Sequence, residues 1–213
     1  LVSQILFGEL FKIIRIEGDS CYIKLDFDGT EGWVENTLIE FLSVEAYQSL
    51  QNSVKIIFER KTELQVHNMM QSMTVLPGSE FRLNGPLANQ MMLGETVFTL
   101  KQRTPIPYRG NIRHSIVSAA KEFLFAPRLW GGRTQYGIDN AGFIQIVCKL
   151  NGITLPRLVT EQVVVGRTYK TYEEALPGDV LFFTKNKSLN HVGILIENNC
   201  VIHVDNQVTI HKL

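Results

Sequence analysis

Residues 137–145 read GIDNAGFIQ, and this stretch decides how the C-terminal half of the chain is interpreted. It follows the loop LWGGR, residues 129–133, and opens an apolar segment that predicts a helix. Two histidines, His191 and His203, come later at strand-like positions. A loop, a helix N-terminus and two ring nitrogens are the parts of a site built around a nucleophilic thiol. The position that should carry the thiol is Asn140.

The composition is that of an ordinary globular protein. The 213 residues are 45% hydrophobic and 20% charged, and the length allows two or three small domains. A formal net charge of +0 argues against binding nucleic acid by phosphate neutralisation. No apolar run approaches the roughly 20 residues that span a bilayer, and no basic-then-apolar secretory signal opens the chain. Because the first residue is Leu rather than Met, we expect that an initial segment has been removed.

Three cysteines are present, at Cys21, Cys148 and Cys200. Their odd number and wide spacing argue against a disulfide framework and against a zinc site. They leave the redox compartment open.

Residues 10–43 predict β structure. Cys21, Ile23 and Leu25 alternate with polar residues, as in a strand with one buried face, and Asp28-Gly29 is a turn signal. The stretch EGWV, residues 31–34, resembles the end of a bacterial SH3-like domain. We predict a small barrel over residues 1–50 in which Trp33 lies in the core rather than forming a ligand platform.

Residues 61–102 predict a second β segment of similar length. Residues 74–83 read as strand, Pro-Gly turn, strand, and residues 91–98 as a hairpin. We predict a second SH3-like barrel over residues 51–104, with the methionines at 69, 70, 91 and 92 filling the core. Residues 104–107, TPIP, predict a linker.

The hydrophobic period changes after the linker. Apolar residues between 116 and 124 share one helix face, and Pro127 ends that helix. A second helix is predicted from about Gly142 to Leu150. Strands follow at residues 180–183, 191–197 and 200–204, so helices precede strands and residues 105–213 predict an α+β domain.

Seven blocks follow one another between residues 110 and 213. They are WGG (130–132), GID (137–139), GFIQ (142–145), NGITLPR (151–157), PGDVLFF (177–183), HVGI (191–194) and IH (202–203). In order and spacing they resemble the NlpC-type cell-wall endopeptidases. The resemblance implies a papain-like fold and cleavage of peptidoglycan stem peptides after γ-D-glutamate. Paired SH3-like domains in front of such a domain are also familiar in that family.

The chain departs from the family at the site itself. The family's hallmark is Asp-Cys-Ser-Gly, whereas this chain has Asp139-Asn140-Ala141-Gly142, and Arg128 stands where the family usually has a tyrosine. The resemblance implies that Asn140, His191 and His203 are the remnant of a catalytic triad. It also implies a substrate-binding role for Asp139, which in the family helps hold the free amine of the stem peptide, and for the positions Ala141, Arg128 and Trp130.

Each of these residues also has a structural interpretation. Asn140 could cap the helix, the histidines could be relics, Arg128 could be a solvated loop residue, and Trp130 could belong to the core or to a pocket wall. Asp139 could join His191 and His203 around zinc, an interpretation that we disfavour, as we disfavour a replacement nucleophile. Cys148 lies eight positions along the helix, about 12 Å away, and Cys200 follows another strand. His67, His114 and His211 have no partner that the sequence names.

We therefore predict an α+β chain, with a papain-like domain at residues 105–213 behind two SH3-like barrels. The leading hypothesis is a catalytically inactive homologue of a γ-D-glutamyl-diamino-acid endopeptidase that binds a peptidoglycan stem peptide or a protein partner, without metal or cofactor. The alternatives are an active hydrolase or transferase with another nucleophile, and an assembly module with a closed cleft. The family alone implies a location at the bacterial cell envelope.

Overall fold

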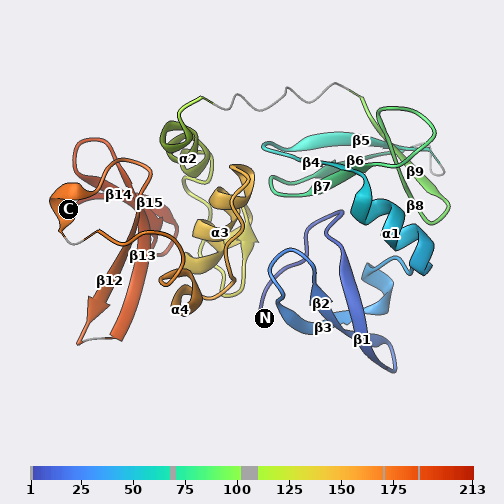
Figure 1. Cartoon of the computed structure of the whole chain (residues 1–213), viewed down its shortest axis with the longest axis horizontal. Coiled ribbons are helices and arrows are strands. Elements are labelled where there is room, and N and C mark those ends of the chain that lie inside the picture. The colour runs from blue at the N-terminus through green and yellow to red at the C-terminus, as the bar shows by residue number, and fades with distance from the viewer. Residues whose placement is uncertain (1, 68–70, 102–109, 170, 187) are drawn as a thin grey trace. The chain divides into compact units, whose positions relative to one another are not determined.

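A computed structural model of the chain describes residues 2–67, 71–101, 110–169, 171–186 and 188–213. The fold is mixed α/β, and the chain divides into two compact units (Figure 1). The N-terminal unit is Ile5–Ile106, and the C-terminal unit combines Leu1–Gln4 with Pro107–Leu213. The predicted linker at residues 104–107 lies outside the described residues. Among the described helices, none is long and apolar enough to cross a membrane.

The N-terminal unit contains small sheets and one α-helix. Strand β1 pairs with β2 and β2 with β3, β4 pairs with β7, and β6-β5-β9-β8 form a four-stranded sheet. Within the described residues, none of these sheets closes into a barrel. The elements are β1 (Phe11–Glu17), β2 (Ser20–Leu25), β3 (Glu31–Glu35), the 3-10 helix η1 (Asn36–Leu38), α1 (Val44–Asn52), β4 (Val54–Ile57), β5 (Thr62–Val66), β6 (Gln71–Val75), β7 (Glu80–Leu83), β8 (Gln90–Leu93) and β9 (Thr96–Leu100).

The alternation predicted for β2 is confirmed, but the position predicted for Trp33 is wrong. Cys21, Ile23 and Leu25 are buried and form a small hydrophobic cluster. Trp33 pairs with Tyr22 across the strands, which places both side chains on the opposite face of the sheet. Trp33 is 48% exposed. The strand register therefore overrode the general preference of tryptophan for a core.

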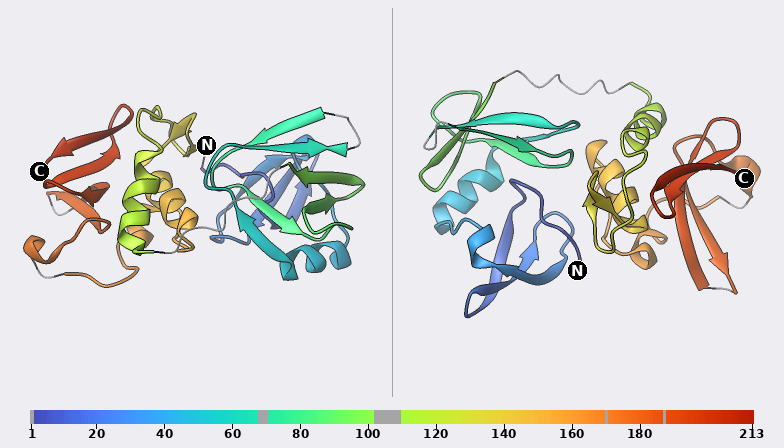
Figure 2. Two further views of the ribbon diagram at one scale, coloured as in Figure 1. Left: turned by 90° about the horizontal axis from the view of Figure 1, so that it is seen from above. Right: turned by 180° about the vertical axis from the view of Figure 1, so that it is seen from behind.

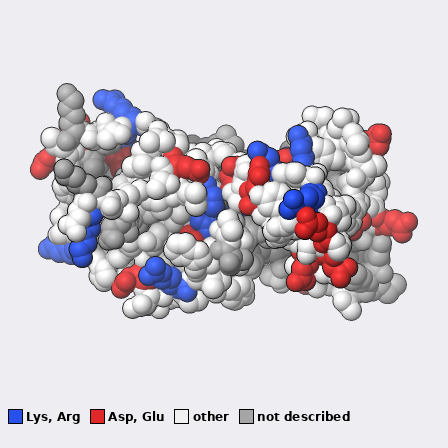
Figure 3. Space-filling view, turned by 90° about the horizontal axis from the view of Figure 1, so that it is seen from below, with Lys and Arg blue, Asp and Glu red and all other residues white. Residues whose placement is uncertain are grey.

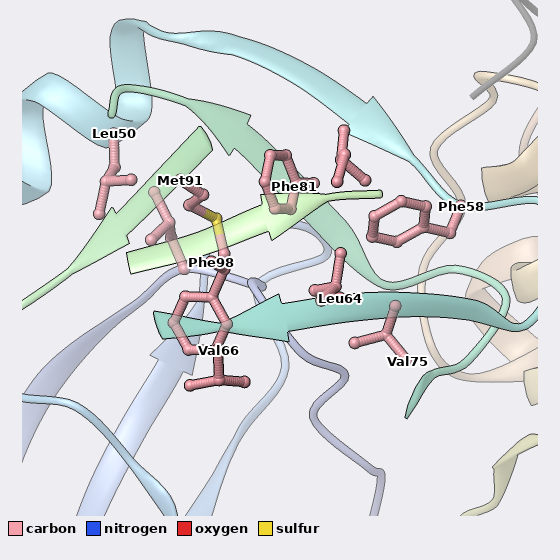
Figure 4. Packing of buried hydrophobic residues seen from close by; sticks show 10 residues of the cluster. Leu50, Phe58, Leu64, Val66, Val75, Phe81, Met91 and Phe98 are labelled. Atoms are coloured by element: carbon pink, nitrogen blue, oxygen red, sulfur yellow. The ribbon is translucent and has the colours of Figure 1, made fainter. Parts of the chain in front are cut away.

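A larger core lies between the remaining sheets of this unit (Figure 4). Phe58 and Phe81 meet edge to face there with ring centroids 6.0 Å apart. Met91 is fully buried and fills this core as predicted, whereas Met92 is 43% exposed; Met69 and Met70 lie outside the described residues. The predicted hairpin is β8–β9, but β6 and β7, predicted as strand-turn-strand, join different sheets.

The C-terminal unit places helices first and a four-stranded antiparallel sheet after them, as the sequence predicts. The sheet order is β12-β13-β14-β15, and β10 and β11 form a short separate pair (Figure 2). The elements are α2 (Ile112–Lys121), β10 (Arg133–Thr134), β11 (Gly137–Ile138), α3 (Asn140–Leu150), α4 (Val159–Gln162), the 3-10 helix η3 (Tyr172–Glu174), β12 (Val180–Lys185), β13 (Ser188–Ile196), β14 (Cys200–Val204) and β15 (Val208–Lys212).

Helix α3 is the central element of this unit. It is buried from Ala141 to Lys149 and packs against α2, β13 and β14. Phe143 meets Phe123 edge to face, with ring centroids 6.2 Å apart. A helix that is apolar on almost every side needs neighbours on every side. Its N-terminus, which begins at Asn140, is thereby held against β13.

Candidate active site

The N-terminus of α3 is fixed by Asp139. This residue is the N-cap, and its Oδ1 accepts a hydrogen bond from the backbone N–H of Gly142 at 2.7 Å. Its Oδ2 accepts from the N–H of Gly131 at 2.8 Å. The guanidinium of Arg157, only 4% exposed, donates to both oxygens at 3.0 and 2.7 Å. The interpretation of Asn140 as the N-cap is therefore wrong, because Asp139 takes that role and Asn140 is the first helical residue.

The loop before the helix approaches α3 so closely that only glycine fits. A Cβ on Gly142 would lie 2.2 Å from the carbonyl oxygen of Gly132. A Cβ on Gly132 would in turn lie 2.3 Å from the carbonyl oxygen of Gly137. Real carbon and oxygen atoms do not approach to these distances, and the atoms met are backbone. The glycines of the two motifs thus let the loop dock against the helix N-terminus.

Asn140 and three histidines form a line of contacts across the sheet. The Nδ2 of Asn140 lies 2.9 Å from Nδ1 of His191, and Nε2 of His191 lies 2.5 Å from Nδ1 of His203. The Nε2 of His203 then lies 2.8 Å from Nδ1 of His211. Strand register explains the line: His203 pairs with Gly193 and with Thr209, so the other rings lie two residues away on the same face.

The direction of these hydrogen bonds follows from the amide. The Nδ2 group of Asn140 only donates, so Nδ1 of His191 accepts and its proton is on Nε2. That proton is donated to Nδ1 of His203, whose Nε2 proton is donated to His211. In this arrangement His191 and His203 each carry one ring N–H, on Nε2, and Nδ1 of His211 is the last acceptor. We call Asn140, His191, His203 and His211 the imidazole relay.

The electrostatics favour the neutral rings. Burial is the largest cause that lowers the pKa of His191; Asp205 opposes it, and the charge of Arg128 adds to it. Burial likewise lowers the pKa of His203 to about 4, reinforced by His191 and His211 and opposed by Asp205. Both rings are therefore neutral at neutral pH, and each keeps a single ring N–H. A thiol nucleophile would need such a ring to accept its proton, and Asn140 has no ionisable proton to give.

The other predicted site residues are placed as follows. Ala141 is buried, and its carbonyl oxygen accepts from Nε2 of Gln162 at 3.0 Å. Arg128 is exposed; its backbone N–H donates to the carbonyl of Asn206 at 2.9 Å. Trp130 is 73% exposed, which excludes the core interpretation.

The structure supports neither a cysteine elsewhere in the chain as a replacement nucleophile nor zinc binding by Asp139 with His191 and His203. Cys148 is buried, and burial raises the pKa of its thiol to about 12, so it is not a thiolate at neutral pH. Cys200 is partly exposed, with Sγ 3.5 Å from the carbonyl oxygen of Asn198. Both carboxylate oxygens of Asp139 are engaged by Arg157, and across the described residues no three His, Cys, Asp or Glu side chains group as metal ligands.

Sequence reasoning missed His211, Arg157 and Gln162. His211 lies on β15, a strand that the sequence analysis did not predict. Arg157 is the last residue of the block NGITLPR (151–157), and its place in that block is the feature of the sequence that could have identified it. Gln162, only 2% exposed, joins the carbonyls of Ala141 and Pro156.

Parts of this chain resemble known proteins. Residues 126–213 match the NlpC/P60 family. The chain is 24% identical over 212 residues to the γ-D-glutamyl-L-lysine dipeptidyl-peptidase of Bacillus subtilis, covering 94% of this chain and 71% of that protein. It is 38% identical over 94 residues to the probable endopeptidase p60 of Listeria seeligeri, covering 44% of this chain and 18% of that protein.

A solved structure shares the fold of the whole chain. The crystal structure of an NlpC/P60 family protein from Bacillus cereus matches with a TM-score of 0.82 and 21% identity, covering 99% of this chain and 76% of that one. The helix-then-sheet order and the loop docked on α3 belong to the part of the chain that the family match covers. Residues 126–213 are therefore a domain of the NlpC/P60 family.

Proposed function

We propose that this protein is a catalytically inactive homologue of the γ-D-glutamyl-diamino-acid peptidases that binds a peptidoglycan stem peptide through the inherited cleft. One observation carries the proposal: the amide of Asn140 lies at the helix N-terminus, 2.9 Å from the ring of His191, where a nucleophile would be activated. We also propose three domains, with SH3-like modules at residues 1–50 and 51–104 before the NlpC-type domain at 105–213, and a location at the cell envelope.

The chemistry of Asn140 supports inactivity. A carboxamide does not ionise and does not attack a carbonyl as a thiolate does, and in serine hydrolases loss of the nucleophile costs on the order of a million-fold in rate. The neutral rings of His191 and His203 are consistent with this, because no thiol is present to protonate His191. The buried Cys148, with its pKa raised to about 12, is no substitute.

The unmatched oxygen of Asn140 supports binding. Its Oδ1 is buried and has no hydrogen-bond partner in the structure. A buried acceptor left unpaired costs about 1–3 kcal/mol, and a rotation of the side chain that turns this oxygen towards an N–H of a bound peptide would remove that cost. Trp130 lies in the loop at residues 129–133 and Arg128 directly precedes it. Both are exposed, and they offer an apolar surface and a cation to such a ligand. The relative from Bacillus subtilis is named for a γ-D-glutamyl-L-lysine substrate, which suggests the peptide class.

Charge is consistent with a peptide ligand rather than a polyanion. Lys, Arg, Asp and Glu side chains are interspersed on the face shown in Figure 3, and the formal net charge is +0. A chain that holds nucleic acid needs a cationic stripe to neutralise phosphates.

The test uses the full chain and the tripeptide L-Ala-γ-D-Glu-L-Lys. We expect no cleavage by mass spectrometry, together with amide NMR shifts at the start of α3 and on β13. We expect Asn140→Cys to introduce cleavage at least about 100-fold above the parent chain, because the thiol would face His191. The matched control is the double variant Asn140→Cys, His191→Ala, which should stay inactive.

Two results would contradict the proposal in different ways. Cleavage by the parent chain that is lost in His191→Ala would establish an active enzyme. Absence of any shift at millimolar tripeptide would remove the binding role and favour a protein partner or an assembly module with a closed cleft.

A further inference from the structure

The sheet β1-β2-β3 exposes an aromatic pair on its outer face. Tyr22 on β2 and Trp33 on β3 are directly opposite in the register, and their ring centroids are 5.3 Å apart. A β-bulge between Ile13 and Arg15 shifts β1 so that Arg15, not Ile14, pairs with Tyr22. The three side chains therefore lie in one row across the sheet, and we call this row the aromatic face.

The geometry of the row leaves the indole accessible. The guanidinium carbon of Arg15 lies 5.0 Å from the centroid of Trp33 and 5.9 Å from that of Tyr22. Trp33 is 48% exposed and the Arg15 side chain 59% exposed. An exposed cation–π contact is worth only about 0.5–1 kcal/mol, so a ligand displaces Arg15 at little cost.

Paired charges surround the aromatic face. Nζ of Lys24 lies 3.0 Å from Oε1 of Glu31, and Nε of Arg15 lies 2.9 Å from Oε1 of Glu17. The hydroxyl of Tyr22 donates to the same Glu31 carboxylate at 3.4 Å. By register, Lys12, Ser20 and Glu35 are further outward positions and are polar, while Ile14 at the bulge is apolar and 54% exposed. Three cations and three anions thus share this surface.

We propose that the aromatic face is a binding site for a neutral saccharide. A hexose ring presents one face of C–H groups, which packs on an indole, and hydroxyl groups at its edge, which both donate and accept hydrogen bonds. The aromatic face offers the matching pattern: one aromatic row, with carboxylates that accept and cations that donate on either side. Its balanced charge suits a ligand without charge.

Other occupants fit less well. A polyanion or an anionic membrane would meet Glu17, Glu31 and Glu35 together with the cations. The core of a protein interface is depleted of charged residues, whereas here ion pairs adjoin the aromatic row directly. This site belongs to the N-terminal unit, whereas Asn140 belongs to the C-terminal unit, and it does not depend on the proposed function.

The test is an NMR titration of the full chain with the neutral tetramer of N-acetylglucosamine. We expect shifts in β1, β2 and β3 with saturation below about 10 mM, and an affinity about tenfold weaker in Trp33→Ala, which corresponds to the loss of one stacking contact. Tyr22→Phe should bind within about twofold of the parent, because it keeps the ring. Phe125→Ala is the matched control, since it removes an exposed aromatic ring, 73% exposed, from the other unit.

The dispersion of the same spectra shows whether each variant is folded. Arg15→Ala is a second variant of the aromatic face, and it leaves both aromatic rings in place. No shift at about 10 mM, or equal affinity in the parent and Trp33→Ala, would overturn the saccharide site. So would tighter binding of a basic or acidic peptide to the same three strands. Tripeptide binding at Asn140 tests the proposed function independently, because that ligand contains no sugar.

Discussion

Asn140 changes the chemistry of the site while keeping a hydrogen bond in it. Its amide nitrogen donates to His191 and so sets the tautomer of every ring beyond it in the imidazole relay. A cysteine would do the opposite, since its thiol gives its proton to the ring and the resulting thiolate accepts a hydrogen bond from the charged imidazolium. The substitution therefore keeps His191 in place and leaves the rings neutral.

The neutral rings predict how stability depends on pH. The pKa of His203 falls from 6.5 to about 4 in the folded chain, so protonation favours the unfolded chain. The stabilisation is complete above pH 6.5 and is lost as the pH falls from 6.5 towards about 4. We expect the C-terminal unit to lose roughly 1 to 3 kcal/mol over this interval, measured by urea unfolding at each pH.

Variants separate this effect from the titration of carboxylates. His203→Asn should flatten the profile between pH 4 and 6.5, with a smaller effect from His191→Asn, whose pKa is lowered for the same first cause. His114, exposed on α2, is the matched control, and His114→Ala should leave the profile unchanged. A profile that is equally steep in His203→Asn would contradict the assignment.

At the scale of elements, the ion pair of Asp139 with Arg157 fixes the start of α3. Removal of one partner from a buried pair leaves a charge without compensation and costs about 3–5 kcal/mol. We expect a loss of this size in Asp139→Ala, together with lower amide protection in the first turn of α3. The matched control is Glu63→Ala, which breaks an exposed pair with Lys101 and should cost less than about 1 kcal/mol.

The close approach of the loop to α3 predicts that Gly142→Ala changes stability in the direction opposite to that expected from helix propensity. Replacement of a helical glycine by alanine usually stabilises by about 1 kcal/mol. Here the new Cβ would lie 2.2 Å from the carbonyl oxygen of Gly132, so Gly142→Ala should instead destabilise, by more than about 2 kcal/mol in urea unfolding. Gly152→Ala is a useful comparison, because a Cβ there meets no atom within 4 Å and is strained only by a φ of +76°. A stabilised Gly142→Ala would show that the loop moves away freely.

The sequence alone predicts a feature more readily when the interacting residues lie close together in the chain or in recognisable motifs. Asn140, His191 and His203 could be found because motif spacing identifies each of them. His211 could not, because its contact with His203 needs the register of β14 and β15. Trp33 was misplaced for the same reason, since composition favours a core while register decides the face. Alternation within one strand, as in β2, was sufficient.

At the scale of the whole molecule, the first residues of the sequence belong to the C-terminal unit. Ser3 accepts a hydrogen bond from Nε of Arg157 at 3.0 Å. The side chain of Gln4 accepts from the backbone N–H of Arg133 at 2.7 Å, and its carbonyl accepts from the Arg133 guanidinium at 2.8 Å. Arg133 is fully buried. Residues 3 and 4 therefore accept hydrogen bonds from two arginines that lie beside the start of α3, since Arg157 pairs with Asp139 and Arg133 lies next to Gly142.

This connection predicts that a change near the start of the sequence acts on the C-terminal unit. Gln4→Ala removes the acceptor of the Arg133 N–H but keeps the backbone carbonyl, and an unpaired buried donor costs about 1–3 kcal/mol. Hydrogen exchange followed by mass spectrometry should show faster exchange in β10, β11 and the first turn of α3, with the strands of Ile5–Ile106 unchanged. Gln51→Ala, on the exposed side of α1, is the matched control and should alter neither region. Faster exchange confined to Ile5–Ile106 in Gln4→Ala would mean that residues 2–4 stabilise the N-terminal unit instead, and the link from Gln4 through Arg133 to the start of α3 would be refuted.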